Sequence, residues 1–213
     1  MELFDTKIIS ISNQKGGVGK TTSSINIASY LAASEVPTLI IDMDPQANST
    51  SGLGVELDKD SRSIYDVIIK EAQINDAILN TQLDYLDIVP ASSQLVGAEI
   101  ELVSEISREF RLKEALDSIR GKYKYVIIDS PPSLGLLTLN VLTSSDSIMI
   151  PIQCEYYALE GLSQLVRTIE LVRSSTNPNL EIEGVVLTMF DGRNNLAKQV
   201  MDDVKSYFGD RVF

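Results

Sequence analysis

The residue types best suited to chemistry stand together near the N-terminus, in the run Gln14-Lys15-Gly16-Gly17-Val18-Gly19-Lys20-Thr21-Thr22. A mainly apolar run, 8–11, precedes it, and the stretch 21–33 that follows has the composition of a helix. A glycine-rich loop between a strand and a helix lets backbone N–H groups surround a polyphosphate, and the helix N-terminus adds partial positive charge. Lys20 can then contact phosphate oxygens, and the Thr21 hydroxyl can bind Mg²⁺. The run predicts a nucleoside triphosphate as ligand.

The loop departs from the ordinary phosphate-loop pattern, G-x-x-x-x-G-K-[ST], at its first two positions. Gln14 stands where the first glycine belongs, and Lys15 follows it. Two lysines this close in one loop repel each other until an anion neutralises both. Lys15 is either an ordinary solvated lysine or a phosphate ligand. We predict a phosphate contact, to a nucleotide held by a facing copy of the chain.

Carboxylates follow two of the expected strands. Asp42 and Asp44 end one apolar run, and Asp129 ends another. Ligands of open α/β sheets bind beyond the carboxyl ends of the strands, so these side chains should lie near the loop. We predict that Asp129 supports Mg²⁺, that Asp44 orients or deprotonates the attacking water, and that Asp42 is structural. The small polar stretch 47–52 is expected to be mobile and to close over the γ-phosphate.

Short β-branched runs alternate with helical stretches along the whole chain, which is typical of a parallel sheet with crossover helices. We predict strands at 8–12, 38–42, 86–89, 125–129, 147–150 and 182–187. We predict helices at 21–33, 63–71, 94–103, 109–120, 134–142, 158–173 and 196–208. Because the strands are apolar throughout, helices should cover both faces of the sheet. The sequence therefore predicts one α/β domain over 1–213, with a mostly parallel central sheet.

Composition restricts the remaining chemistry. None of the 213 residues is a histidine, so imidazole bases and histidine metal sites are excluded within this sequence. The net charge of −12 argues against a uniformly basic nucleic-acid-binding surface, although it leaves room for a local basic patch. A single cysteine, Cys154, and the lack of a long apolar run predict a reducing, cytoplasmic location.

Several motifs together resemble the ParA/MinD group of ATPases. The loop from Lys15 to Thr22 looks like the deviant Walker A loop of that group. Further segments, 42–46 together with 51–54, 128–135 and 151–161, are similar to its ParA/Soj chromosome-partitioning branch. The likeness extends over essentially the whole chain. It implies a P-loop NTPase fold of the deviant Walker A subclass, and ATP and Mg²⁺ as cofactors.

The resemblance also implies a cycle of assembly. ATP joins two copies into a sandwich homodimer, which binds double-stranded DNA without sequence preference, on the nucleoid. A ParB/Spo0J-type centromere-binding protein then stimulates hydrolysis and separates the pair. Carried over to this chain, Lys15 reaches the other subunit's nucleotide, Lys20 and Thr21 hold phosphate and magnesium, and Asp44 assists the attacking water. In the same way, Asp129 supports the metal, residues 15–22 bind the nucleotide, and Arg193 matches a DNA-contacting arginine.

Two alternative functions stay open from the sequence. One is a membrane-positioning ATPase of the MinD kind, which uses a C-terminal amphipathic helix that these residues do not display. The other is a nucleotide switch with little hydrolysis, because the family continues beyond Phe213 and we expect the chain to be truncated there. An iron–sulfur electron donor with the same loop is excluded, since it needs two cysteines per subunit.

Overall fold

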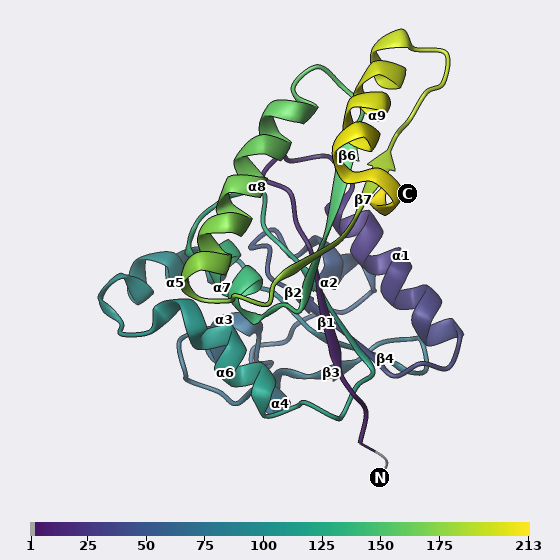
Figure 1. The fold of residues 1–213 in the computed structure, drawn as a ribbon. Helices are drawn as coiled ribbons and strands as arrows, with labels where there is room; N and C mark the ends of the chain where they lie inside the picture. The colour runs from purple at the N-terminus through teal and green to yellow at the C-terminus, as the bar shows by residue number, and fades with distance from the viewer. Residues whose placement is uncertain (1–2) are drawn as a thin grey trace.

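A seven-stranded sheet forms the centre of the computed structural model, which describes residues 3–213 (Figure 1). The strand order is β3-β4-β2-β5-β1-β6-β7, and five of the six pairings are parallel, with β3 antiparallel at one edge. The strands are β1 (Lys7–Ile11), β2 (Thr38–Asp42), β3 (Leu79–Asn80), β4 (Leu86–Val89), β5 (Tyr125–Asp129), β6 (Ser147–Gln153) and β7 (Glu181–Thr188). The predicted fold class is confirmed.

Helices connect the strands and pack on the sheet. They are α1 (Lys20–Ala33), α2 (Asn48–Gly52), α3 (Ile64–Ile68), α4 (Ile74–Ala77), α5 (Leu95–Glu101), α6 (Arg111–Asp117), α7 (Leu136–Ser144), α8 (Ala158–Ser175) and α9 (Asn195–Phe208). Short 3₁₀ helices follow at Leu102–Ser104, Arg108–Phe110 and Gly209–Arg211. None of the helices in the described part of the chain is both long and apolar enough to cross a bilayer.

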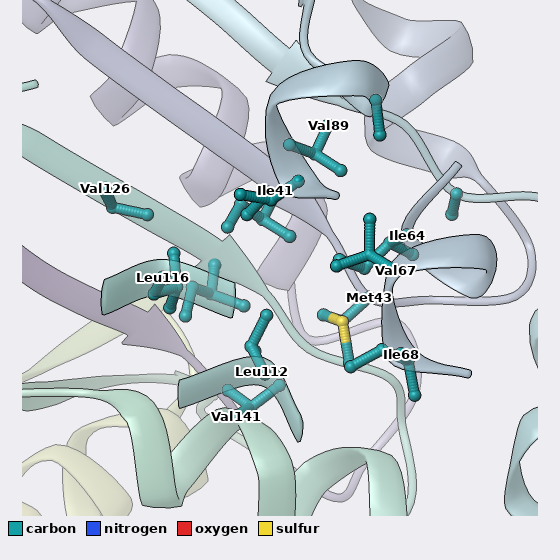
Figure 2. Packing of buried hydrophobic residues seen from close by; sticks show 14 of the residues in the cluster. Ile41, Met43, Ile64, Val67, Ile68, Val89, Leu112, Leu116, Val126 and Val141 are labelled. Atoms are coloured by element: carbon teal, nitrogen blue, oxygen red, sulfur yellow. The ribbon is translucent and has the colours of Figure 1, made fainter. Parts of the chain in front are cut away.

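Alternating residues of the central strands supply two separate hydrophobic cores. Ile41 of β2 and Val126 of β5 pack with Leu116 of α6 and Val141 of α7 in the larger core (Figure 2). The neighbouring positions on the same strands point the other way and pack against α1, as Ile40 does. Strand residues face opposite sides of a sheet in turn, so both faces are covered, as the continuous apolar runs predicted.

The β6–β7 end of the sheet has a third core, with α8 and α9 packed on it (Figure 1). The last residues of the chain lie beside β7. The Phe213 N–H donates to the Val185 carbonyl at 2.8 Å, and the Leu187 N–H donates to the Phe213 carbonyl at 3.1 Å. These bonds form a parallel bridge between Val185 and Val212.

The structure corrects several expected boundaries. The helix expected at 63–71 ends at Ile68, and the one expected at 109–120 is divided into a 3₁₀ turn and the shorter α6. The sequence pattern missed β3 and α4, which have only two and four residues. The stretch 47–52, expected to be a mobile loop, contains α2 instead. Its small polar residues give a loop-like composition, and hydrogen bonds to buried carboxylates stabilise the helical form.

Candidate functional site

The phosphate-loop segment forms a sharp turn between β1 and α1. Gly17 and Gly19 have φ angles of 75° and 88°, in the left-handed region that residues with a Cβ rarely adopt. A Cβ added to Gly19 would also lie 3.4 Å from the Thr188 methyl group at the end of β7. The Thr188 hydroxyl donates to the Val18 carbonyl at 2.9 Å, which fixes the loop from the far side. The loop therefore depends on glycine at a crowded position.

A pocket of about 350 Å³ opens in front of this loop. It is lined by Gly16, Gly17, Gly19, Lys20, Thr21, Thr22, Asp44, Gln46, Asn48, Pro132 and Met189. The pocket lies at the carboxyl ends of the central strands, where open α/β sheets bind ligands. The first turn of α1 contributes its free N–H groups and its positive dipole end to the pocket, which favours an anion there.

Lys20 is the cation of this pocket and is almost fully buried, with 6% of its surface exposed. Its Nζ donates to the Lys15 carbonyl of the same loop at 3.1 Å. Burial lowers the pKa of the Lys20 ammonium, while the charges of Asp129 and Asp44 act in the opposite direction. A polyphosphate bound in the pocket would add negative charge beside this ammonium and would favour its charged form further.

Asp129 is fully buried at the end of β5, beside Asp42 at the same register of β2. Its two carboxylate oxygens accept from the Ser24 hydroxyl at 3.1 Å and the Ser49 hydroxyl at 2.7 Å. Burial raises the pKa of Asp129, against the hydroxyl hydrogen bonds of Ser49, Thr21 and Ser24. The oxygens of Asp129 and Thr21 fit Mg²⁺, which prefers a few protein oxygens together with phosphate and water.

Asp44 lines the pocket with 7% of its surface exposed. Its Oδ1 accepts from the Gln46 N–H at 2.9 Å, and its own N–H donates to Asp42 Oδ1 at 3.1 Å. Asp42 does not line the pocket, and its other oxygen binds the backbone and hydroxyl of Thr50. Hydrogen bonds thus hold Asp44 at the wall of the pocket, whereas Asp42 is buried outside the pocket lining.

Comparisons with known proteins agree with this geometry. A family model described as an AAA domain matches residues 6–182. The sporulation initiation inhibitor protein Soj of Bacillus subtilis is 56% identical over 97% of this chain and 82% of its own length. The chromosome partitioning protein ParA of Myxococcus xanthus is 55% identical over 97% of this chain and 73% of its own length. The chain belongs to the ParA/Soj family.

A solved structure shares the fold closely. It is the cobyrinic acid a,c-diamide synthase of Mycobacterium smegmatis with a bound ATP analogue and magnesium, at 38% identity and a TM-score of 0.90. The match covers 96% of this chain and 83% of that one. A P-loop NTPase fold is therefore common to this ParA/Soj family chain and to a protein that holds an adenine nucleotide with magnesium.

In this ParA/Soj family chain, Lys15 is turned away from its own pocket. Its Nζ forms an ion pair with Glu155, which follows β6, and both side chains are 36% exposed. The Asn13 side chain accepts from the Lys15 N–H at 3.0 Å and donates to the Pro151 carbonyl at 2.8 Å. The second lysine of the deviant loop therefore contacts the segment after β6 within its own subunit.

Arg193 lies apart from the pocket, on the loop between β7 and α9. Its side chain is 92% exposed, and its guanidinium binds Asp191 with two hydrogen bonds, of 3.0 and 2.9 Å. These bonds raise the pKa of Arg193 and lower that of Asp191. The predicted DNA-contacting residue is accessible, with an acidic neighbour that competes for it.

The sequence analysis did not single out four residues that line the pocket. Gln46 and Asn48 lie shortly after Asp44 in the sequence, and Pro132 lies shortly after Asp129, so closeness to a predicted site residue could have indicated all three. Met189 had none. It lies just after β7 with a φ of 50°, and only the folded sheet brings it to the phosphate loop.

Proposed function

We propose that this protein is an Mg²⁺-dependent ATPase that segregates DNA. Binding of ATP joins two copies, and the pair binds double-stranded DNA through its backbone. A ParB-type partner stimulates hydrolysis, which separates the copies. The observation that carries the proposal is the convergence of Lys20, Thr21 and Asp44 on one pocket, with Asp129 behind them. We further propose that residues 1–213 act as one ATPase domain, in the cytoplasm and on the nucleoid.

Each residue has a defined part in the proposed hydrolysis. Lys20 and the N–H groups of residues 16–21 bind the β- and γ-phosphates, and Thr21 and Asp129 would hold Mg²⁺. The ion, once bound, neutralises charge that develops on the phosphates. Asp44 orients a water molecule for in-line attack on the γ-phosphate and accepts its proton, which is the usual task of a carboxylate beside a nucleotide.

Lys15 supplies the proposed link between ATP and dimer formation. A lysine that leaves Glu155 and contacts the γ-phosphate of a second copy makes nucleotide binding and dimerisation mutually stabilising. Loss of the γ-phosphate removes that contact, so the pair separates after hydrolysis. The name of the Myxococcus xanthus relative, a chromosome partitioning protein, supports DNA segregation as the outcome.

Light scattering under saturating nucleotide tests the proposal. We expect a dimer with Mg²⁺ and a non-hydrolysable ATP analogue, and a monomer with ADP or without magnesium. Retention on duplex DNA should follow the same nucleotide dependence and decline at high salt, because phosphate contacts release counterions. A protein that stays monomeric under saturating Mg²⁺ and ATP analogue contradicts the proposal.

A further inference from the structure

Two consecutive hydroxyl residues of α2 bind the two buried carboxylates of the site. The Ser49 hydroxyl donates to Asp129 Oδ2 at 2.7 Å. The Thr50 hydroxyl and N–H both donate to Asp42 Oδ2 at 2.8 Å. Ser49 is fully buried and Thr50 is 4% exposed, and neither lines the pocket, so both act from behind it.

The bond from Ser49 completes the orientation of Asp129. Ser24 of α1 holds one carboxylate oxygen and Ser49 of α2 holds the other, so the two helices fix the plane of the group from different sides. Mg²⁺ demands near-ideal octahedral geometry, and partners that orient its ligands typically change metal affinity by about 10- to 100-fold.

The bonds from Thr50 reach Asp44 through Asp42. The Thr50 hydroxyl accepts from the Ala91 N–H at 3.0 Å, in the segment after β4, while it donates to Asp42. Asp42 Oδ1 in turn accepts from the Asp44 N–H at 3.1 Å. A continuous set of hydrogen bonds therefore runs from the end of β4 to the backbone of the residue that faces the attacking water.

We propose that Ser49 and Thr50 are positioning residues of the ATPase site, with different targets. Ser49 orients Asp129 and so sets the response to magnesium. Thr50, through Asp42, fixes Asp44 and so sets the rate of hydrolysis. This inference rests on the proposed function. Helix α2 then positions both the carboxylate that supports magnesium, Asp129, and the carboxylate that orients water, Asp44. The sequence had suggested a closing loop at this place instead.

A magnesium titration tests the part of Ser49. Binding of a fluorescent non-hydrolysable ATP analogue is measured against Mg²⁺ concentration in wild type, Ser49→Ala and Ser51→Ala. Ser51 is the matched control, because its hydroxyl lies on the same helix, is exposed, and bonds only the Ala47 carbonyl at 2.8 Å among the described residues. We expect Ser49→Ala to need about 10-fold more Mg²⁺ for half-maximal binding, and Ser51→Ala to match wild type.

Equal magnesium dependence in Ser49→Ala and wild type overturns the assignment of Ser49. A variant that merely loosens the fold shows a lower melting temperature in the absence of nucleotide and the same half-maximal magnesium concentration, which also counts against it. If the wild-type protein binds no nucleotide, the proposed function itself is wrong, and this outcome is distinct from a failure of the Ser49 assignment.

Steady-state kinetics test the part of Thr50. Thr50→Val keeps the shape of the side chain and removes the hydroxyl that bonds Asp42, so we expect kcat to fall about 10-fold with KM for ATP within twofold. Thr50→Ser restores the hydroxyl and should recover most of kcat. A loss that is the same in both variants, or one that appears in KM instead, overturns the assignment of Thr50.

Discussion

The two loops that carry the predicted basic residues differ in how firmly the fold fixes them. In the phosphate loop, Lys20 is 6% exposed, bonded to the loop's own backbone, and flanked by two carboxylates. On the loop before α9, the Arg193 side chain is 92% exposed, and its partner Asp191 belongs to the same short turn. The contacts of a buried cation are fixed by the fold. The contacts of an exposed cation depend on the molecules that bind there.

The largest effect should come from removing the buried cation. Lys20→Ala takes away the ammonium that we propose contacts the phosphates, an interaction of about 4 kcal/mol at an effective dielectric constant near 20. We expect ATP affinity measured by calorimetry to fall about 1,000-fold. Lys59→Ala, which removes an exposed lysine from the loop before α3, is the charge-matched control. Nucleotide affinity that survives the loss of Lys20 would place the phosphates elsewhere.

Removal of the pocket carboxylate should separate binding from hydrolysis. Asp44→Ala leaves the loop and Lys20 in place, so ATP should still bind and join two copies. Phosphate release should fall by about 100-fold or more, the usual loss when a positioned acid or base is removed. Single-turnover kinetics and light scattering on the same sample check both halves. Hydrolysis that continues at the wild-type rate rules out Asp44 as the group that orients water.

The sequence predicted features that depend on neighbouring residues better than features that depend on distant ones. Motifs that depend on neighbours in the chain, such as residues 15–22, predicted the glycine-containing turn and the helix that follows it. The ends of β2, β4 and β5 were also predicted to the residue. The apolar runs of β2 and β5 end in Asp42 and Asp129, and the run of β4 stops before Pro90. The local signal was sufficient wherever the contacts were local.

Features made by distant residues could not be predicted in this way. Nothing in the composition of 47–52 indicates that Ser49 meets Asp129, 80 positions away, and so the stretch resembles a loop. The ion pair between Lys15 and Glu155 joins residues 140 positions apart for the same reason. The position of Met189 beside the phosphate loop depends on the packing of β7 at the far end of the sheet.

Asp42, at the end of β2, and Asp191, on the loop before α9, should respond to pH in opposite directions. Burial, with a smaller contribution from Asp129, raises the pKa of Asp42 from 3.8 to about 6, against the hydrogen bonds from Thr50 and Asp44. The folded chain therefore binds this proton more tightly than the unfolded chain, and its stability should rise as pH falls from 7.5 through 6. The full difference is about 3 kcal/mol. Asp191, whose pKa is lowered by Arg193, should instead lose stabilisation only as pH falls below its ordinary value.

Urea unfolding of the nucleotide- and magnesium-free protein at pH 5.5 to 8 measures this effect. Asp42→Asn is expected to reduce the slope of unfolding free energy against pH in that range, with a residual slope from Asp129. An unchanged slope in Asp42→Asn would exclude this carboxyl as the titrating group.

Lys15, which is intermediate in exposure between Lys20 and Arg193, should give a smaller effect. Its ion pair with Glu155 must open before Lys15 can make the proposed contact with a second copy, and such partly exposed pairs contribute about 0.2–1 kcal/mol. Glu155→Gln should therefore lower the ATP concentration for half-maximal dimerisation by up to about fivefold. Glu160→Gln, an exposed acid on the first turn of α8, is the charge-matched control. A higher ATP requirement in Glu155→Gln would mean that this pair supports the dimer.

The smallest effect, and the sharpest test of the exposed loop, comes from Arg193 and Asp191 together. Arg193→Ala removes one proposed phosphate contact, so DNA affinity should fall a few-fold, and the slope of log affinity against log salt should lessen by about 1. Asp191→Asn removes the competing carboxylate and should raise DNA affinity by about threefold, with dimerisation unchanged in both variants. A fall in DNA affinity in Asp191→Asn would show that the bidentate pair orients the guanidinium for DNA. In that case Asp191 preorganises Arg193 for binding. The two loops would then differ in the burial of their cations and not in whether neighbouring residues fix them.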